Sequence, residues 1–191
     1  MSERKNLKIV AFAGLAGSGK SAAVEHLTKH GIPKIYFGGI IYKAMADAGI
    51  EVTWDSQQVF REDIRAKEGN DFVVKRAIKE VHELASAGQH RIVLDGLYTW
   101  SEYRILKHEF PGEMTAIAVV TPKHLRYQRM ANRPERPMTK EEVDTRDWSE
   151  IENLEKGGPI AIADHFVIND GSIEKLHDQL DTILNKIDFN N

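Results

Sequence analysis

The sequence predicts an α/β fold in which helices cover both faces of a parallel β-sheet. Short apolar runs rich in β-branched residues alternate with longer segments whose apolar residues recur at helical spacing. Strands that are separated by helices pair in parallel through right-handed crossovers, so the alternation indicates a three-layer α/β/α sandwich. The length of 191 residues and the hydrophobic content of 41% suit one domain with a substantial core.

Five segments have the short, apolar character of buried strands. The expected strands are residues 7–13, 33–37, 91–95, 114–120 and 165–170. The expected helices are residues 20–30, 40–48, 56–67, 72–87, 99–110 and 139–155, with further helices that begin at residues 121–122 and 172.

Local signals support several of the helix ends. Gly88 follows a helical segment and can adopt the left-handed conformation that commonly ends a helix. Thr99 with Glu102, and Thr139 with Glu142, have the spacing of a capping box, in which each side chain binds the other residue's backbone N–H. These pairs predict helices that begin directly after residues 99 and 139.

The composition excludes several classes of protein. The net charge of −3 argues against a surface that binds nucleic acid, and the absence of cysteine excludes a disulfide framework and cysteine–zinc sites. The sequence contains no apolar stretch of membrane-spanning length and no secretory signal near its first residues. We therefore expect a cytoplasmic protein with neither a membrane nor a nucleic-acid partner.

The first expected strand is followed by a glycine-rich loop and a helix. Residues 14–21, GLAGSGKS, fit the pattern G-x-x-x-x-G-K-[ST], which is typical of a phosphate-binding loop. Glycines let backbone N–H groups turn toward phosphate oxygens, and the positive end of the following helix points to the same place. An ordinary glycine-rich turn is the alternative, but the strand–loop–helix context opposes it. The expected phosphate-binding residues are Gly14, Leu15, Ala16, Gly17, Ser18, Gly19, Lys20, Ser21 and Ala22.

Two side chains of this pattern and one further carboxylate indicate the ligands ATP and Mg²⁺. Lys20 can reach the β- and γ-phosphates, and the Ser21 hydroxyl can bind Mg²⁺. Asp95 ends the apolar strand RIVLD, as a metal-binding aspartate of such proteins would. We expect Ser21 and Asp95 to hold the metal; a turn or N-cap aspartate is the alternative for Asp95.

Basic residues gather in one short segment of this slightly acidic protein. Arg126, Arg129 and Arg133 recur on one helical face, and Arg146 follows in the stretch TRDW. Arginine forks suit phosphate oxygens and can neutralise charge during phosphoryl transfer. The alternative is a solvated helix face that forms only surface ion pairs.

These stretches together resemble P-loop kinases of the nucleoside monophosphate kinase group. The resemblance is strongest to the adenylate-kinase-related proteins of archaea and bacteria, and weaker to the dephospho-CoA kinases. It rests on GLAGSGKS, IRAKEGNDFVVKRAI, IVLDGLYTWSEY, the arginine helix with TRDW, and IADHFVINDGSIEKLHDQL. It implies the P-loop NTPase fold with strand order 2-3-1-4-5 in one domain over residues 1–191, an acceptor-binding segment near residues 39–89 and a lid near residues 126–150.

The resemblance also implies roles for single residues. The catalytic residues would be Lys20, Asp95, Arg126, Arg129 and Arg146. Asn169 and Gly171 match a loop near the adenine, and Arg65 matches an arginine of the acceptor segment.

The chain differs from the adenylate-kinase-like pattern at two positions of the expected acceptor site. Tyr42 and Tyr98 stand where adenylate-kinase-like members usually have arginines that grip an acceptor phosphate. A tyrosine can donate a hydrogen bond but brings no charge. The residues expected to bind the acceptor are Gly38, Tyr42, Arg65 and Tyr98.

The expected function is ATP-dependent phosphoryl transfer to a small nucleotide-like acceptor. A phosphate acceptor is already anionic and mainly needs positioning, whereas a hydroxyl acceptor benefits from a carboxylate base. No carboxylate follows the second expected strand, which favours the phosphate acceptor, although Asp95 could serve as a base. Two alternatives stay open: transfer to a ribose hydroxyl as in dephospho-CoA kinases, and a nucleotide-binding ATPase or regulator without a small-molecule acceptor.

Overall fold

The computed structural model describes residues 6–69 and 71–190, without the side chains of residues 54, 55, 57, 58, 61, 62 and 65. Within these ranges it contains a parallel sheet of five strands in the order β2-β3-β1-β4-β5. The strands are β1 Lys8–Ala13, β2 Lys34–Tyr36, β3 Arg91–Asp95, β4 Met114–Val120 and β5 His165–Ile168. The predicted fold class and strand order are therefore confirmed.

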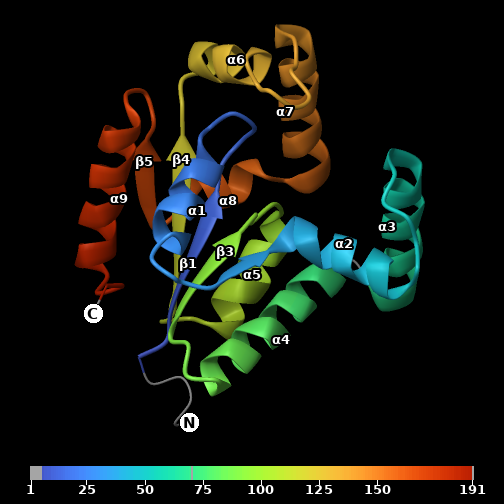
Figure 1. Cartoon of the computed structure of the whole chain (residues 1–191), viewed down its shortest axis with the longest axis horizontal. Helices are drawn as coiled ribbons and strands as arrows, with labels where there is room; N and C mark the ends of the chain where they lie inside the picture. Colours follow the sequence, from blue (N-terminus) through green and yellow to red (C-terminus); the bar gives the residue numbers. More distant parts are fainter. Residues whose placement is uncertain (1–5, 70, 191) are drawn as a thin grey trace.

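The helices connect the strands and extend beyond the sheet on two sides (Figure 1). They are α1 Lys20–Thr28, α2 Phe37–Asp47, α3 Trp54–Glu68, α4 Phe72–Ser86, α5 Trp100–Glu109, α6 Lys123–Ala131, α7 Lys140–Leu154, α8 Gly157–Ala161 and α9 Ile173–Lys186. Both predicted capping boxes, at the starts of α5 and α7, are present. None of the helices described is both long and apolar enough to cross a lipid bilayer.

Two hydrophobic cores lie on opposite faces of the sheet. On one face Val10 and Phe12 of β1 pack with α1 and α9, and on the other Ile9 and Ala11 pack with α2, α4 and α5. Successive side chains of a strand point to opposite faces, so a strand covered on both sides must be apolar throughout. This requirement explains the continuous apolar run of β1 and the three-layer arrangement.

The connection after β2 differs from the sequence prediction. The strand was expected to reach Phe37 and the helix to begin at Ile40, but α2 begins directly at Phe37. Gly38 permits this tight turn, because a Cβ atom there would lie 2.6 Å from the ring of Tyr36. The short helix α8, which the sequence analysis did not predict, follows α7 after two intervening residues.

The sheet register brings the candidate site residues to one edge. Asp95 of β3 pairs with Phe12 of β1 on one side and with Tyr36 of β2 on the other. The loop after β1 and the end of β3 therefore meet at the carboxyl edge, where parallel α/β sheets bind ligands. Near this edge α2 and α3 extend to the right in Figure 1, and α6 and α7 lie above it.

Candidate phosphate-binding site

The glycine-rich loop between β1 and α1 passes close to neighbouring parts of the chain. Gly19 has a left-handed backbone with φ of 93°, and a Cβ atom there would lie 2.0 Å from the side-chain nitrogen of Asn169. Gly17 is also left-handed, with φ of 77°, and a Cβ atom would lie 3.0 Å from Met130. Side chains at either position would force the loop away from the protein, so glycine is required there.

Hydrogen bonds from three other segments anchor the loop. The carbonyl oxygen of Ser18 accepts from the side chains of Asn169, at 2.8 Å, and Thr121, at 2.8 Å. The carbonyl oxygen of Ala16 accepts from the Arg126 guanidinium at 3.0 Å. Because protein groups hold these carbonyls, hydrogen bonds within the protein help to fix the shape of the loop that is expected to bind phosphate.

A cavity of about 220 Å³ lies inside the loop. At its floor the Nζ atom of Lys20 lies 2.5 Å from Oδ1 of Asp95, whose residue is 8% exposed. This ion pair joins the first helix to the end of β3. A bound phosphate that pairs with Lys20 would replace the Asp95 carboxylate and leave it free for another ligand. The lining residues are Gly14, Leu15, Ala16, Gly17, Ser18, Lys20, Ser21, Tyr36, Asp95, Tyr98, Arg133, Arg146 and Lys156.

The donor set of this cavity fits Mg²⁺. The Ser21 hydroxyl and the Asp95 carboxylate both line the cavity, and each offers the hard oxygen ligand that magnesium prefers. Magnesium usually keeps several waters and takes its remaining ligands from substrate phosphates, so two protein oxygens are sufficient.

The arginines of the predicted lid separate into two groups. Arg126 is 5% exposed and bonds Asp147 through both terminal nitrogens, at 3.0 and 2.5 Å. Arg129 donates to the hydroxyl of Thr121, at 3.2 Å, and to the carbonyl of Asn169, at 3.1 Å. Arg126 therefore braces α6 against the loop and α7, whereas Arg129 braces α6 against the residues that follow β4 and β5. Arg146 and Arg133 line the cavity instead.

An ion-pair cluster forms the wall opposite the loop. The carboxylate of Glu150 accepts from Nε of Arg146, at 3.0 Å, and from Nζ of Lys156, at 2.7 Å. Burial alone would raise the pKa of Glu150, but Lys156 and Arg146 outweigh it and hold that pKa below its ordinary value. Burial lowers the pKa of Lys156, and Glu150 opposes that effect. Neither Glu150 nor Lys156 was singled out from the sequence.

The ring of Tyr98 lies close to both lysines of the cavity. The Nζ atoms of Lys156 and Lys20 lie 5.0 and 5.8 Å from the centre of its ring. Burial raises the pKa of the Tyr98 hydroxyl above its ordinary value, and nearby Asp95 and Glu150 raise it further. The phenol therefore stays protonated and can donate a hydrogen bond to a ligand.

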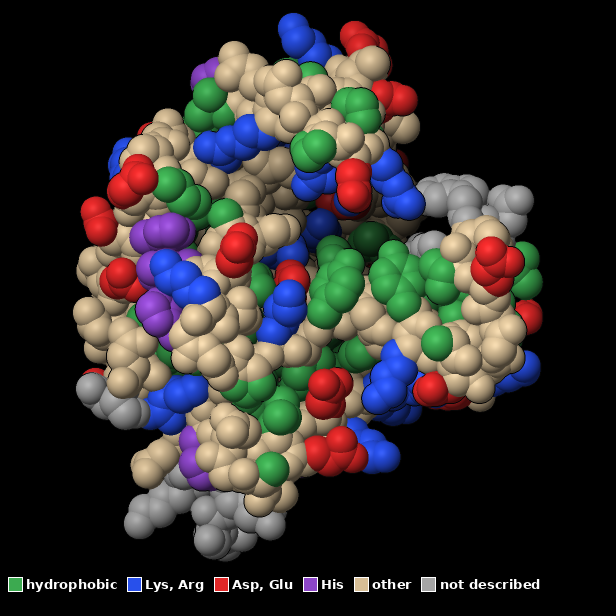
Figure 2. Space-filling model, in the orientation of Figure 1, with side chains coloured by type: hydrophobic (Ala, Val, Ile, Leu, Met, Phe, Trp, Pro, Cys, Tyr) green, Lys and Arg blue, Asp and Glu red, His purple; other side chains and the backbone are tan. Residues whose placement is uncertain are grey.

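A second cavity of about 290 Å³ adjoins the first and shares Tyr36, Tyr98 and Arg146 with it. Its other lining residues are Phe37, Gly38, Ile41, Tyr42, Val73, Thr99, Glu102, Glu150 and Leu154. Figure 2 shows Lys and Arg side chains around the hollow at the centre of this face, with hydrophobic side chains beside it. The second cavity thus offers aromatic and apolar surface next to a charged one.

The remaining predicted residues have varied positions. Gly38, Tyr42 and Tyr98, the described residues predicted to bind the acceptor, all line the second cavity. Asn169 braces the glycine-rich loop, while Gly171 lies in the turn before α9, with its Cα facing the side chain of Lys175. Ala22 lies in the first turn of α1 and packs on the core. The side chain of Arg65, on α3, is outside the described residues.

The fold and the phosphate-binding loop define a P-loop protein with a kinase-like fold. The family described as AAA domain matches residues 10–152 of the chain. A UPF0200 protein from Thermococcus gammatolerans is 35% identical over 182 residues, which cover 94% of this chain and 95% of that protein. The chain belongs to the AAA domain family and to the UPF0200 proteins.

Solved structures with a similar fold include two kinases. A shikimate kinase from Bacteroides thetaiotaomicron superposes with a TM-score of 0.59 at 9% identity, covering 95% of this chain and 98% of that one. A dephospho-CoA kinase from Campylobacter jejuni superposes with a TM-score of 0.57 at 15% identity, with the same coverage. At these identities the likeness concerns the fold alone.

Proposed function

We propose that the protein transfers the γ-phosphoryl group of Mg²⁺-bound ATP to a small nucleotide-like acceptor. One observation carries this proposal: the cavity of the phosphate-binding loop, with Lys20 and Asp95, adjoins a second cavity and shares walls with it. A donor and an acceptor can therefore lie side by side, as a direct transfer requires. Kinases among the proteins of similar fold support the same class of reaction.

The loop amides and Lys20 bind the donor phosphates, and Ser21 and Asp95 hold the metal. Magnesium, when bound, neutralises negative charge on the phosphates. Arg133 and Arg146 line the cavity and add positive charge where the transferred group must pass. Arg126 and Arg129, which the resemblance implied to be catalytic, hold the segment that carries Arg133 in place.

The acceptor is assigned to the second cavity, with residues 39–89 as the acceptor segment and residues 126–150 as the lid. Tyr42 and Tyr98 face it in place of the arginines that would grip a phosphate. Among the described residues that line the second cavity, Arg146 is the cation, and it already forms an ion pair with Glu150. Because little positive charge faces the second cavity, a hydroxyl acceptor is better supported by the structure than it was by the sequence. Transfer to a hydroxyl, as in dephospho-CoA kinases, is therefore the second candidate function. Asp95, once released by Lys20, could then take the hydroxyl proton.

An acceptor screen tests the proposal. Purified protein with Mg²⁺ and ATP is incubated with nucleosides, nucleoside monophosphates, dephospho-CoA and polyols, and ADP formation is measured. We expect one acceptor class to stimulate ADP formation, and Lys20→Ala to reduce the stimulated rate by about a hundredfold or more while the protein stays folded. Lys29→Ala, an exposed lysine just after the same helix, is the matched control.

Slow ADP release that no acceptor stimulates would contradict the kinase proposal and favour the ATPase or regulator. Stimulated turnover that Lys20→Ala leaves unchanged would contradict the assignment of the site.

A further inference from the structure

Lys156 is a buried cation at the wall of the phosphate cavity. It is 2% exposed and lies between α7 and α8, where Glu155 adopts a left-handed backbone with φ of 51°. The backbone N–H of Lys156 donates to the carbonyl of Glu150 at 3.2 Å, which closes the turn. This turn directs the ammonium group inward, beside Tyr98, instead of into solvent.

The charges around Lys156 do not cancel. Glu150 is bonded by two cations, Lys156 and Arg146, so this cluster carries one surplus positive charge. The pair Lys20–Asp95 across the cavity is neutral by comparison. A buried charge is costly unless an opposite charge compensates it. The Arg146 side chain is 44% exposed, so solvent compensates much of its charge; the cluster nevertheless carries one more positive than negative charge, and Lys156 and Arg146 line the cavity in which phosphate is expected.

We propose that Lys156 is a second phosphate-binding lysine of this site, which exchanges the carboxylate of Glu150 for the terminal phosphate of the bound nucleotide. The inference rests on the proposed function. Lys156 and Lys20 lie beside the ring of Tyr98, 5.0 and 5.8 Å from its centre. Tyr98 borders both cavities, so Lys156 meets the donor at the end nearest the acceptor.

Selective loss of affinity for the terminal phosphate tests this role. Calorimetry measures the binding of Mg²⁺–ATP and Mg²⁺–ADP to the wild-type protein and to Lys156→Met, with the melting temperature as a check of folding. We expect the variant to bind ATP about tenfold more weakly, since a charged hydrogen bond is lost, and ADP less than about twofold more weakly. Lys140→Met, on the exposed start of α7, should bind both nucleotides as the wild type does.

Equal losses for ATP and ADP would show that Lys156 only shapes the cavity, and unchanged affinities would show that it meets no phosphate; either result overturns the inference and leaves the kinase proposal intact. If the wild-type protein binds neither nucleotide, the proposed function fails together with the inference.

The dependence of ATP affinity on pH gives a second test, because this dependence would not change if Lys156 only shaped the cavity. Glu150 and Arg146 from α7, Lys20 from α1 and the ring of Tyr98 surround the Lys156 ammonium group, and Asp95 from β3 lines the same cavity. Burial lowers the pKa of Lys156, so its charge is lost as the pH rises toward that lowered value. ATP affinity of the wild type should fall at alkaline pH earlier than that of Lys156→Arg, whose guanidinium stays charged. Identical profiles would contradict the inference.

Discussion

At the scale of residues, the site depends on buried charges that are compensated by partners far away in the sequence. Arg126 and Asp147 form such a pair, with side chains only 6% and 7% exposed. The guanidinium also bonds the carbonyl of Ala16 in the phosphate-binding loop. One ion pair therefore connects α6, α7 and the loop, so removing either partner should affect all three.

Removing Arg126 should destabilise the protein more than removing the whole ion pair. Arg126→Ala leaves the Asp147 carboxylate buried and uncompensated, and we expect it to lower the free energy of unfolding by about 3–5 kcal/mol. The double variant with Asp147→Ala should recover a large part of that loss, because no lone charge remains. Urea unfolding measures both.

Arg104→Ala, an exposed arginine on α5, is the control and should change the free energy of unfolding by less than about 0.5 kcal/mol. If the double variant is less stable than Arg126→Ala, the carboxylate is not what destabilises the single variant.

At the scale of elements, local capping decides where helices begin beside the site. The Thr99 hydroxyl accepts from the backbone N–H of Glu102 at 3.0 Å, and the Glu102 carboxylate accepts from the N–H groups of Thr99 and Tyr98, both at 2.9 Å. The capping box thus starts α5 and also holds the backbone of Tyr98, which forms part of both cavities.

Loss of this cap should weaken the protein measurably. Thr99→Ala removes the hydroxyl acceptor, and we expect the free energy of unfolding to fall by about 1 kcal/mol. Thr182→Ala, in the interior of α9, is the matched control; because alanine has the higher helix propensity, it should leave the stability unchanged or slightly raised. A stability loss of equal size in both variants would mean that the cap has no special role.

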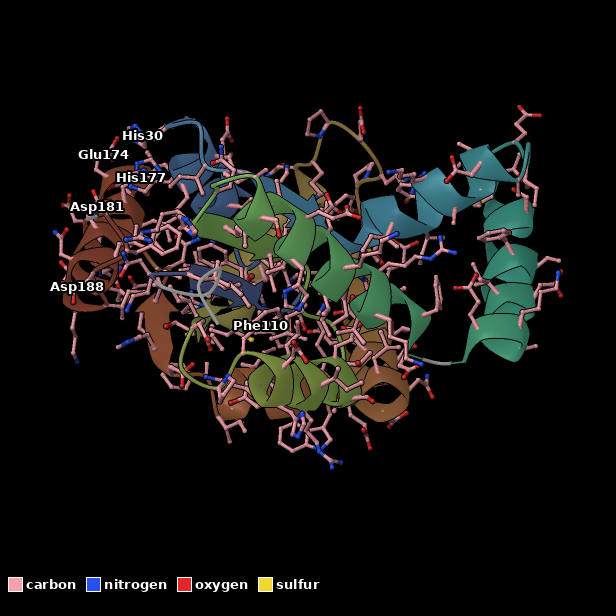
Figure 3. All side chains as sticks on the ribbon, turned by 90° about the horizontal axis from the view of Figure 1, so that it is seen from below. His30, Phe110, Glu174, His177, Asp181 and Asp188 are labelled. Carbon is pink, nitrogen blue, oxygen red and sulfur yellow. The ribbon has the colours of Figure 1, made fainter. Side chains whose placement is uncertain are left out.

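At the scale of the whole molecule, α1 and α9 cover one face of the sheet and meet through histidines. The rings of His26 and His177 stack at 4.1 Å between centroids, and Nε2 of His26 lies 2.7 Å from Asp181. Figure 3 shows His30, Glu174, His177 and Asp181 together at this end of the molecule. The helix that begins at the phosphate-binding loop is therefore packed on α9 through groups that can take up protons.

Acid should loosen this packing. Partial burial lowers the pKa of His177, and the positive charges of His26 and Lys29 lower it further, while Asp181 and Glu174 oppose them. The unfolded chain then binds a proton more readily than the folded one, so stability is lost as the pH falls through the unfolded value of about 6.5. The melting temperature should drop less between pH 7.5 and 5.5 in His177→Gln than in the wild type.

His124→Gln, an exposed histidine on α6, should show the same acid-induced drop as the wild type. If the melting temperature of His177→Gln falls as much as that of the wild type between pH 7.5 and 5.5, protonation of His177 is not what destabilises the protein in acid.

Much of the fold could be predicted because its signals are local. The apolar runs, the glycine-rich loop and the capping boxes each lie within a few consecutive residues, and the observed strands, loop and helix starts agree with them. The start of α2 was placed wrongly, because the contact of Gly38 with the ring of Tyr36 decides it. The strand order was obtained from a resemblance and was not determined by any local pattern.

The sequence by itself determined the phosphate-binding loop, with Lys20 and Ser21, since that motif works through adjacent backbone groups. Only the tertiary structure decided which charged groups lie together. In it Lys20 pairs with Asp95, Arg126 pairs with Asp147, and Lys156 lines the cavity. A buried charge requires a partner in space, and the partner's place depends on how helices and strands pack, not on spacing along the chain. For this reason the glycine-rich loop and Arg146 could be predicted, whereas the place of Glu150 and Lys156 in the opposite wall emerged only from the fold.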